Sequence, residues 1–93
     1  MRPYQTGNAV IQTFNTKNGW MIIEEQETPT HWTTRAFKVF SKKRDQLGVI
    51  QWFPPFRKYA FIPTSGTVYD LACLKDLCDF LEKIGREHKG NYS

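Results

Sequence analysis

Chemically reactive side chains are scarce in this chain. Its 93 residues include only two cysteines and two histidines. Cys73 and Cys78 stand five positions apart in an expected helix, and at about 100° per residue they point roughly 140° away from each other. This spacing excludes an intrahelical disulfide and differs from the two-residue gap of redox pairs and zinc ligands. We therefore expect two small buried thiols and a reducing compartment.

Long apolar runs are also missing. No stretch approaches the roughly 18 consecutive apolar residues that a membrane span needs, and the first residues lack the apolar core of a secretory signal. We therefore expect no membrane contact and a cytoplasmic location. The 3 Trp, 4 Tyr and 7 Phe, with 24% charged residues, argue against disorder. A chain of this length allows one domain over residues 1–93, with a small core.

Groups for acid–base, nucleophilic or metal chemistry are few and poorly spaced. His31 falls in an expected turn and His88 near the end of an expected helix, so we expect both to be solvated. The carboxylates of residues 24–27 alternate between the faces of a strand and are typical of a solvated edge. The Thr64-Ser65-Gly66-Thr67 loop precedes a helix but lacks the lysine of a phosphate loop. The sequence therefore predicts no enzyme activity, no cofactor and no metal site.

Alternating apolar and polar residues predict a series of short strands between residues 9 and 62. The expected strands are 9–14, 20–26, 33–42, 47–53 and 57–62. Turns rich in Asn, Gly, Lys or Pro separate them. These intervals are too short for crossover helices, so four or five strands are expected to form an antiparallel meander. Residues 1–8 are polar and are predicted to be a loose N-terminus.

The apolar period changes after Pro63. Apolar residues recur at intervals of three and four, at Leu71, Leu74, Leu77, Leu81 and Ile84. This stripe predicts an amphipathic helix over residues 70–88, for which Asp70 is a suitable N-cap. The predicted fold is therefore α+β, with two layers: an antiparallel meander of four or five strands packed on one C-terminal helix.

Positive charge and aromatic rings gather in the same part of the chain. The net charge is +4 for the whole sequence, but residues 35–58 hold seven Lys and Arg against only Asp45, which gives +6. Eight of the fourteen aromatic residues lie between positions 32 and 61. The basic character therefore belongs to the central strands and their turns, because the second strand and the helix are slightly acidic.

One helix covers only one face of a sheet, so the opposite face is a candidate binding surface. If Ala60 and Ile62 face the helix, then Arg57, Tyr59 and Phe61 share the open face. By the same alternation, Lys38, Phe40 and Lys42 would join them. Such a surface suits a nucleic acid or a nucleotide, because cations meet phosphates and rings stack on bases.

The candidate site residues fall into two groups. Those expected to bind phosphates are Lys38, Lys42, Lys43, Arg44, Arg57 and Lys58, and those expected to stack on bases or to form an interface are Trp52, Phe56 and Tyr59. The alternative without a function is that the rings are simply the core of a small protein. In that case the lysines are solvated strand edges, which discourage sheet-to-sheet aggregation.

Several short motifs in the second half of the chain carry a resemblance. They are Leu47-Gly48-x-Ile50-x-Trp52, Phe56-Arg57-x-Tyr59-x-Phe61-x-Pro63, Thr67-Val68-Tyr69 and Cys73-Leu74-x-x-Leu77. Over about residues 47–84 the chain resembles small uncharacterised proteins of tailed bacteriophages and prophages, with Phe56 at a position where tryptophan is expected. The resemblance implies a protein acting in the cytoplasm of an infected bacterium. It implies no residue roles.

Two functions from different classes follow from these observations. The first is a non-enzymatic binding module of phage type that holds an anionic nucleic acid or nucleotide. The alternative is a phage protein-interaction module that binds and blocks a host defence protein, because Trp, Tyr, Phe and Arg are also enriched at interface hot spots. A third possibility is a homodimer, in which a second copy covers the open face.

Overall fold

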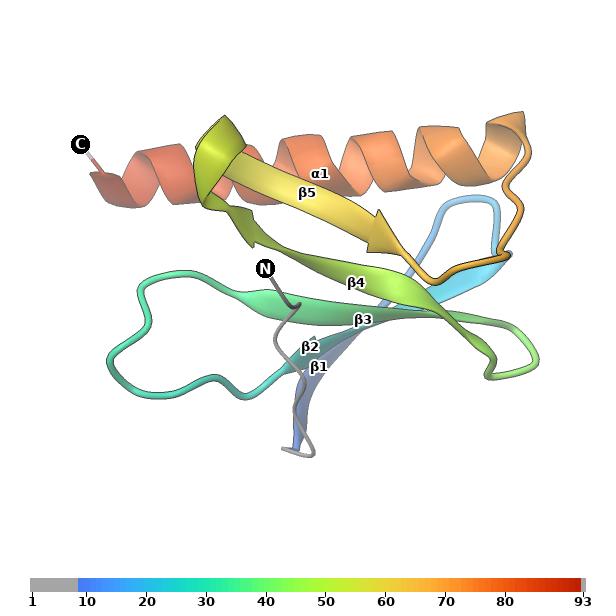
Figure 1. Ribbon diagram of the computed structural model, residues 1–93, viewed down its shortest axis with the longest axis horizontal. Coiled ribbons are helices and arrows are strands. Elements are labelled where there is room, and N and C mark those ends of the chain that lie inside the picture. Colours follow the sequence, from blue (N-terminus) through green and yellow to red (C-terminus); the bar gives the residue numbers. More distant parts are fainter. Residues whose placement is uncertain (1–8, 93) are drawn as a thin grey trace.

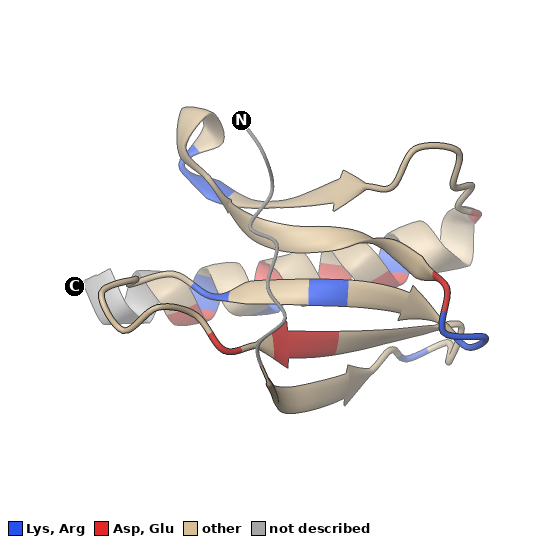
Figure 2. Cartoon of the chain, turned by 60° about the horizontal axis from the view of Figure 1, so that its bottom comes forward, with Lys and Arg blue, Asp and Glu red and all other residues tan. Residues whose placement is uncertain are grey.

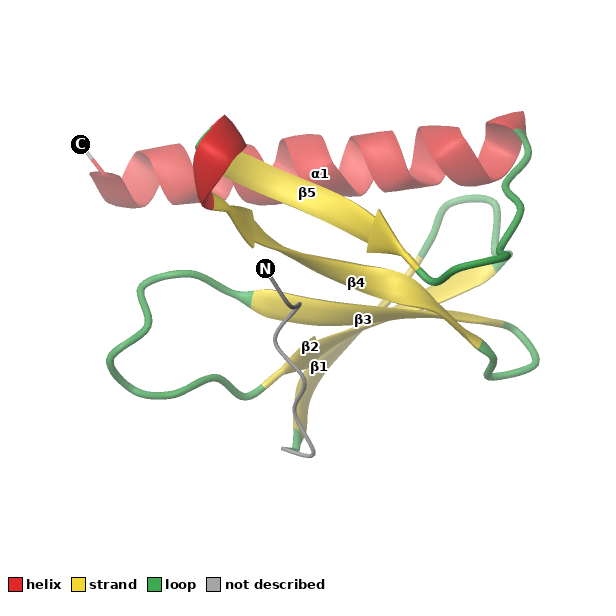
Figure 3. Ribbon diagram, in the orientation of Figure 1, coloured by secondary structure: helices red, strands yellow, loops and turns green. Residues whose placement is uncertain are grey.

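The protein is a five-stranded antiparallel sheet with one helix packed on it (Figures 1 and 3). The computed structural model describes residues 9–92, so the predicted loose terminus at residues 1–8 lies outside the described residues. The elements are β1 (Val10–Asn15), β2 (Met21–Gln26), β3 (Ala36–Ser41), β4 (Gln46–Phe53), the 3-10 turn η1 (Pro54–Phe56), β5 (Lys58–Pro63) and α1 (Leu71–Tyr92).

The strands lie in the sheet in their sequence order, and each pairs with the next in antiparallel register. In Figure 1, α1 runs antiparallel to β5 on the far side of the sheet. The predicted two-layer α+β architecture is therefore confirmed. Within the described residues, no helix is long and apolar enough to cross a membrane.

The register assigns each strand residue to a face, because paired residues of antiparallel strands point the same way. Ile23 pairs with Val39 and Phe37 pairs with Ile50, and all four side chains are buried beneath α1. Gly48 belongs to the same face. A Cβ at this position would lie 2.8 Å from the ring of Phe61 and 2.5 Å from a β5 carbonyl oxygen. The missing side chain therefore lets the Phe61 ring lie directly over β4.

The prediction of which β5 side chains face the helix is wrong. Tyr59 pairs with Trp52 and Phe61 pairs with Ile50, so both β5 rings point toward α1 and into the core. Ala60 and Ile62 lie on the open face instead. The β5 side chains on both faces are apolar, and a shift of one residue exchanges the faces of a strand. The pattern of β5 alone therefore could not distinguish the two arrangements.

The buried stripe of α1 also differs from the predicted one. Leu77 and Ile84 are buried as expected, together with Phe80 and His88, whereas Leu71 is 67% exposed and Leu74 is 51% exposed. At about 100° per residue, Leu71 points roughly 120° away from Leu77. Phe80, which the leucine spacing did not include, is part of the core instead.

The two cysteines lie at the border of this stripe. Both are free thiols, Cys73 half-buried and Cys78 exposed. The prediction of two buried thiols is therefore wrong for Cys78. That residue follows Leu77 immediately, and neighbouring helix positions point about 100° apart.

The first turns of α1 are tied to the loops at one end of the sheet. Asp70 accepts a hydrogen bond of 2.9 Å from the backbone N–H of Cys73, which confirms its predicted role as N-cap and holds its pKa below the ordinary range. The buried Asp76 accepts two further bonds from Asn18, one from its backbone N–H (3.1 Å) and one from its side-chain amide (3.0 Å). These contacts connect the β1–β2 turn to the helix.

Tyr69 anchors the loop between β5 and α1. Its hydroxyl donates a 2.7 Å hydrogen bond to the carbonyl oxygen of Leu47 and lies 2.8 Å from the hydroxyl of Thr67. We expect Tyr69→Phe to lower the free energy of unfolding by about 1 kcal/mol, because the carbonyl of Leu47 loses one of its two donors and keeps only the N–H of Thr64, while the ring stays in place. Urea unfolding would measure this change. An unchanged midpoint would mean that the bond does not hold the loop.

Candidate functional site

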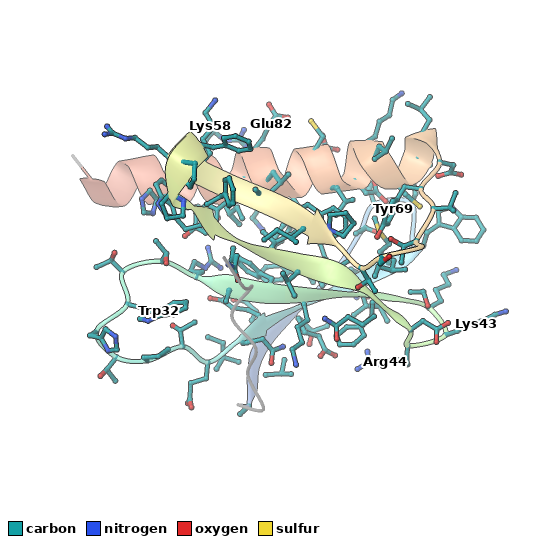
Figure 4. All side chains as sticks on the ribbon, in the orientation of Figure 1. Trp32, Lys43, Arg44, Lys58, Tyr69 and Glu82 are labelled. Atoms are coloured by element: carbon teal, nitrogen blue, oxygen red, sulfur yellow. The ribbon has the colours of Figure 1, made fainter. Side chains whose placement is uncertain are left out.

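The predicted phosphate-binding residues lie at two opposite ends of the sheet. Lys42, Lys43 and Arg44 occupy the β3–β4 turn, whereas Arg57 and Lys58 lie where η1 meets β5 (Figures 2 and 4). The eight residues of β4 separate the two groups, which at about 3.3 Å per residue corresponds to roughly 26 Å. The cations that are dense in the sequence therefore do not form one basic surface.

Most cations near the β3–β4 turn are already engaged within the protein. Arg44 Nη2 lies 2.8 Å from Glu24 Oε2, and its guanidinium group stands 4.8 Å from the centre of the Phe40 ring. The ammonium group of Lys42 stands 5.1 Å from the ring of Trp20. Lys38 is on the open face as predicted, opposite Glu24 in the register. Lys43 is exposed at the tip of the turn.

An ion cluster that the sequence did not reveal connects the sheet to the helix. Arg35 binds Glu25 with Nε and Nη2, both at 2.9 Å, and Glu87 of α1 with Nη1 at 2.6 Å. The hydrogen bonds that Arg35 donates to Glu25 raise the pKa of Arg35 further above its ordinary range. Glu25 is buried, so the expectation of a solvated edge is wrong for this carboxylate.

A cleft of about 530 Å³ lies between the start of β5 and the second half of α1. The rings of Trp52, Tyr59 and His88 form one wall. Trp52 is nearly perpendicular to Tyr59, with centroids 5.4 Å apart, and its centroid lies 4.5 Å from that of His88. Three cations, those of Arg57, Lys58 and Arg86, line the cleft together with Leu81, Glu82 and Gly85.

The cations of the cleft differ from Lys42 and Arg44 of the β3–β4 turn in having no internal partners. Among the described residues, the side chains of Arg57, Lys58 and Arg86 make no ion pair and no hydrogen bond. Figure 4 shows Lys58 and Glu82 pointing the same way from β5 and α1. An anion that enters the cleft would therefore meet three cations and one carboxylate.

Arg57 has an unusual backbone conformation. Its φ of 52° and ψ of 42° lie in the left-handed region, where its N–H donates to the carbonyl oxygens of Phe53 (3.0 Å) and Pro54 (3.1 Å). This region is unfavourable for residues other than glycine, because their Cβ atom lies too close to the backbone. Within residues 9–92, Arg44 is the other non-glycine residue with a positive φ, at 71°, but its side chain contacts Glu24 and Phe40. Arg57 projects a cation without a partner from a strained position.

Four of the nine predicted site residues meet in this cleft: Trp52, Arg57, Lys58 and Tyr59. Phe56 stands outside, 65% exposed, with its ring 4.7 Å from that of Phe53. Tyr59 is only 8% exposed, so it belongs to the wall and cannot present its whole face to a base.

The sequence did not point to the helical half of the cleft, which consists of Leu81, Glu82, Gly85, Arg86 and His88. His88 is buried against Trp52 and Tyr59, so the prediction of a solvated histidine is wrong. Its position one turn after Ile84 was the available signal, since this spacing places it on the buried stripe.

Burial gives Tyr59 a distinct pH dependence. Its hydroxyl accepts a 3.1 Å hydrogen bond from the backbone N–H of Arg35, but burial dominates and raises the pKa of the phenol. The folded protein therefore keeps this proton at a pH where the unfolded chain loses it. The associated stability is present below the unfolded pKa of about 10 and is lost as the pH rises through the folded pKa.

We expect the free energy of unfolding to fall more steeply above about pH 10 in the native protein than in Tyr59→Phe. Urea titrations at a series of pH values would measure both slopes. Equal slopes would show that folding does not change the pKa of the Tyr59 phenol.

Comparison with protein families, curated proteins and solved structures gives no match. The resemblance to phage proteins therefore stays a prediction. Residues 9–92 contain no group of three or more His, Cys, Asp or Glu side chains placed to hold a metal ion.

Proposed function

We propose that this chain is a small non-enzymatic binding module, and that it holds an anionic nucleic acid or nucleotide ligand in the cleft between β5 and α1. The observation that carries the proposal is the combination of three cations without partners and a wall of aromatic rings around one cavity. Phosphate groups would be bound by Arg57, Lys58 and Arg86. A base would lie against the ring of Trp52, which is half-buried and faces the cleft.

This proposal moves the binding surface from the open face of the sheet to the helix side. On the open face, Ala36 and Val49 are both buried, and Arg44 is bound to Glu24. Part of that face is therefore already buried, and one of its cations is already paired. A homodimer remains a prediction, and light scattering at two concentrations would test it.

The test compares two double variants that remove the same charge. Lys58→Gln/Arg86→Gln alters the cleft, and Lys43→Gln/Lys75→Gln alters exposed lysines elsewhere. Isothermal titration with ATP and with a short oligothymidylate should show binding of at least one probe by the native protein. The cleft variant should lose about tenfold or more in affinity, because charge-assisted hydrogen bonds disappear, while the control variant keeps its affinity. Equal losses, or no binding by the native protein, would refute the proposal.

The second candidate is the protein-interaction module that blocks a host protein. It is favoured by three exposed apolar side chains at the start of α1, those of Val68, Leu71 and Leu74. A pulldown from nuclease-treated bacterial lysate would compare Leu71→Ser/Leu74→Ser with the cleft double variant. A partner that is lost only with the leucine variant supports this candidate, and a partner lost only with the cleft variant argues against it.

A further inference from the structure

We infer that the ligand of the cleft is a single nucleotide carrying two or three phosphates, and not a nucleic-acid strand. This inference rests on the proposed function and narrows its ligand class. Three features support it: the size of the cleft, the arrangement of its rings, and the distribution of cations outside it.

The cleft has room for one small ligand. Its volume of about 530 Å³ lies within the range of roughly 300–1,000 Å³ that is typical of small-molecule sites. Proteins that bind single strands instead present successive rings along a groove, one for each stacked base. Here the Trp52 and Tyr59 planes meet at 85° and form a corner. A corner of this kind accepts one ring and offers no platform for the next base.

The cations of the cleft are concentrated at one place. Arg57 and Lys58 are consecutive in the chain, and Arg86 lines the same cleft from the helix. Three positive charges at one site match the charge of a short phosphate chain. Phosphates spaced along a strand would instead require cations at intervals along a path.

Among residues 9–88, no continuous path of free cations leaves the cleft. Toward the start of α1, the helix side that bears Glu82 continues through the exposed Cys78, Leu74 and Leu71. Its one cation, Lys75, lies roughly 16 Å along the helix axis from Arg86, which is too far to continue a row of phosphate contacts. On the far face of the sheet Arg44 is bound to Glu24, and the β3–β4 turn lies roughly 26 Å away along β4. A strand that left the cleft would therefore lose its phosphate contacts.

Glu82 supplies a group that a nucleotide can use and a bare polyphosphate cannot. Its carboxylate lines the cleft and can accept a hydrogen bond from a ribose hydroxyl or from an amino group of a base. The same carboxylate repels additional phosphates. The cleft thus combines a cationic end with an acceptor and a ring wall, as a phosphorylated nucleoside requires.

The experiment titrates the native protein by calorimetry with ATP, GTP, CTP, UTP, tripolyphosphate and an oligothymidylate of about 15 nucleotides. We expect at least one nucleotide to bind with one-to-one stoichiometry and about tenfold more tightly than tripolyphosphate, which has no ring. The oligonucleotide should bind no more tightly than that nucleotide. Lys58→Gln/Arg86→Gln should abolish nucleotide binding, and Lys43→Gln/Lys75→Gln should preserve it.

The outcomes separate this inference from the proposed function. An oligonucleotide that binds about tenfold more tightly than every nucleotide, and that is lost with the cleft variant, overturns the single-nucleotide inference and leaves the proposed function intact. Tripolyphosphate that binds as tightly as the nucleotides also overturns the inference, because the ring would contribute nothing. No binding of any probe overturns both.

Discussion

Arg35→Ala is expected to lower the free energy of unfolding by about 3 kcal/mol, near the lower end of the range for breaking a buried ion pair. The guanidinium group holds the buried carboxylate of Glu25 with two bonds of 2.9 Å. Its side chain is 31% exposed, whereas that of Glu25 is 9% exposed. Removing the guanidinium group would therefore leave a nearly buried charge without its partner. Urea or thermal unfolding would measure the loss.

A second ion pair serves as the control for this prediction. Arg44→Ala breaks the bond to Glu24 at 2.8 Å, and Glu24 is only 13% exposed. The Arg44 side chain is 55% exposed, however, and Lys38 lies opposite Glu24 in the register, so we expect a loss of about 1 kcal/mol or less. Similar losses for both variants would show that burial does not distinguish the two pairs. The double variant Arg35→Ala/Glu25→Gln should recover part of the stability, because it removes the buried charge together with its partner.

The Arg35 cluster also affects the candidate site. Arg35 binds Glu87, which lies between Arg86 and His88 in α1, and both of these neighbours line the cleft. The backbone N–H of Arg35 also donates to the hydroxyl of Tyr59 in β5. Arg35, which immediately precedes β3, therefore contacts both the helix and the β5 side of the cleft, although it is not among the residues that line it.

The strands could be predicted from the sequence because their signals are local. Alternation and turn residues placed all five strands close to their observed bounds, and Asp70 marked the start of α1. The faces of β5 could not be predicted, since its assignment depends on pairing with β4. Both faces of β5 are apolar, so either could pack in the core. The pairing of Tyr59 with Trp52 and of Phe61 with Ile50 places the two rings on the core side.

Only part of the candidate site could be predicted, because some of its residues come together only through tertiary packing. Arg57 and Lys58 could be predicted because basic and aromatic residues cluster around them in the sequence. The density of such residues does not show which cations are free and which are paired within the protein. Arg44 counts equally in the sequence, although its charge is bound to Glu24. Arg86 and His88 come from a helix with no excess of positive charge, and only the packing of α1 beside β5 brings them to the cleft.

Arg57→Gly is expected to weaken ligand binding by about ten- to a hundredfold without destabilising the fold. The loss corresponds to one charge-assisted contact with a phosphate, about 1.5–3 kcal/mol. Glycine relieves a left-handed backbone that costs other residues roughly 1–2 kcal/mol, but it adds up to about 1 kcal/mol of conformational entropy to the unfolded chain. The net change in stability should therefore stay within about 1 kcal/mol. Calorimetric titration and urea unfolding of the same sample would measure both quantities.

Arg44→Gly is the matched control, because Arg44 has the same left-handed backbone at the opposite end of β4. It should leave ligand binding unchanged, since its side chain contacts Glu24 and Phe40 and lies outside the cleft. If Arg57→Gly bound ligand as tightly as the native protein, the arginine would have no role in the cleft. A loss of affinity without a loss of stability would instead explain why an arginine occupies a position that glycine suits better: its guanidinium group is needed for the ligand and not for the fold.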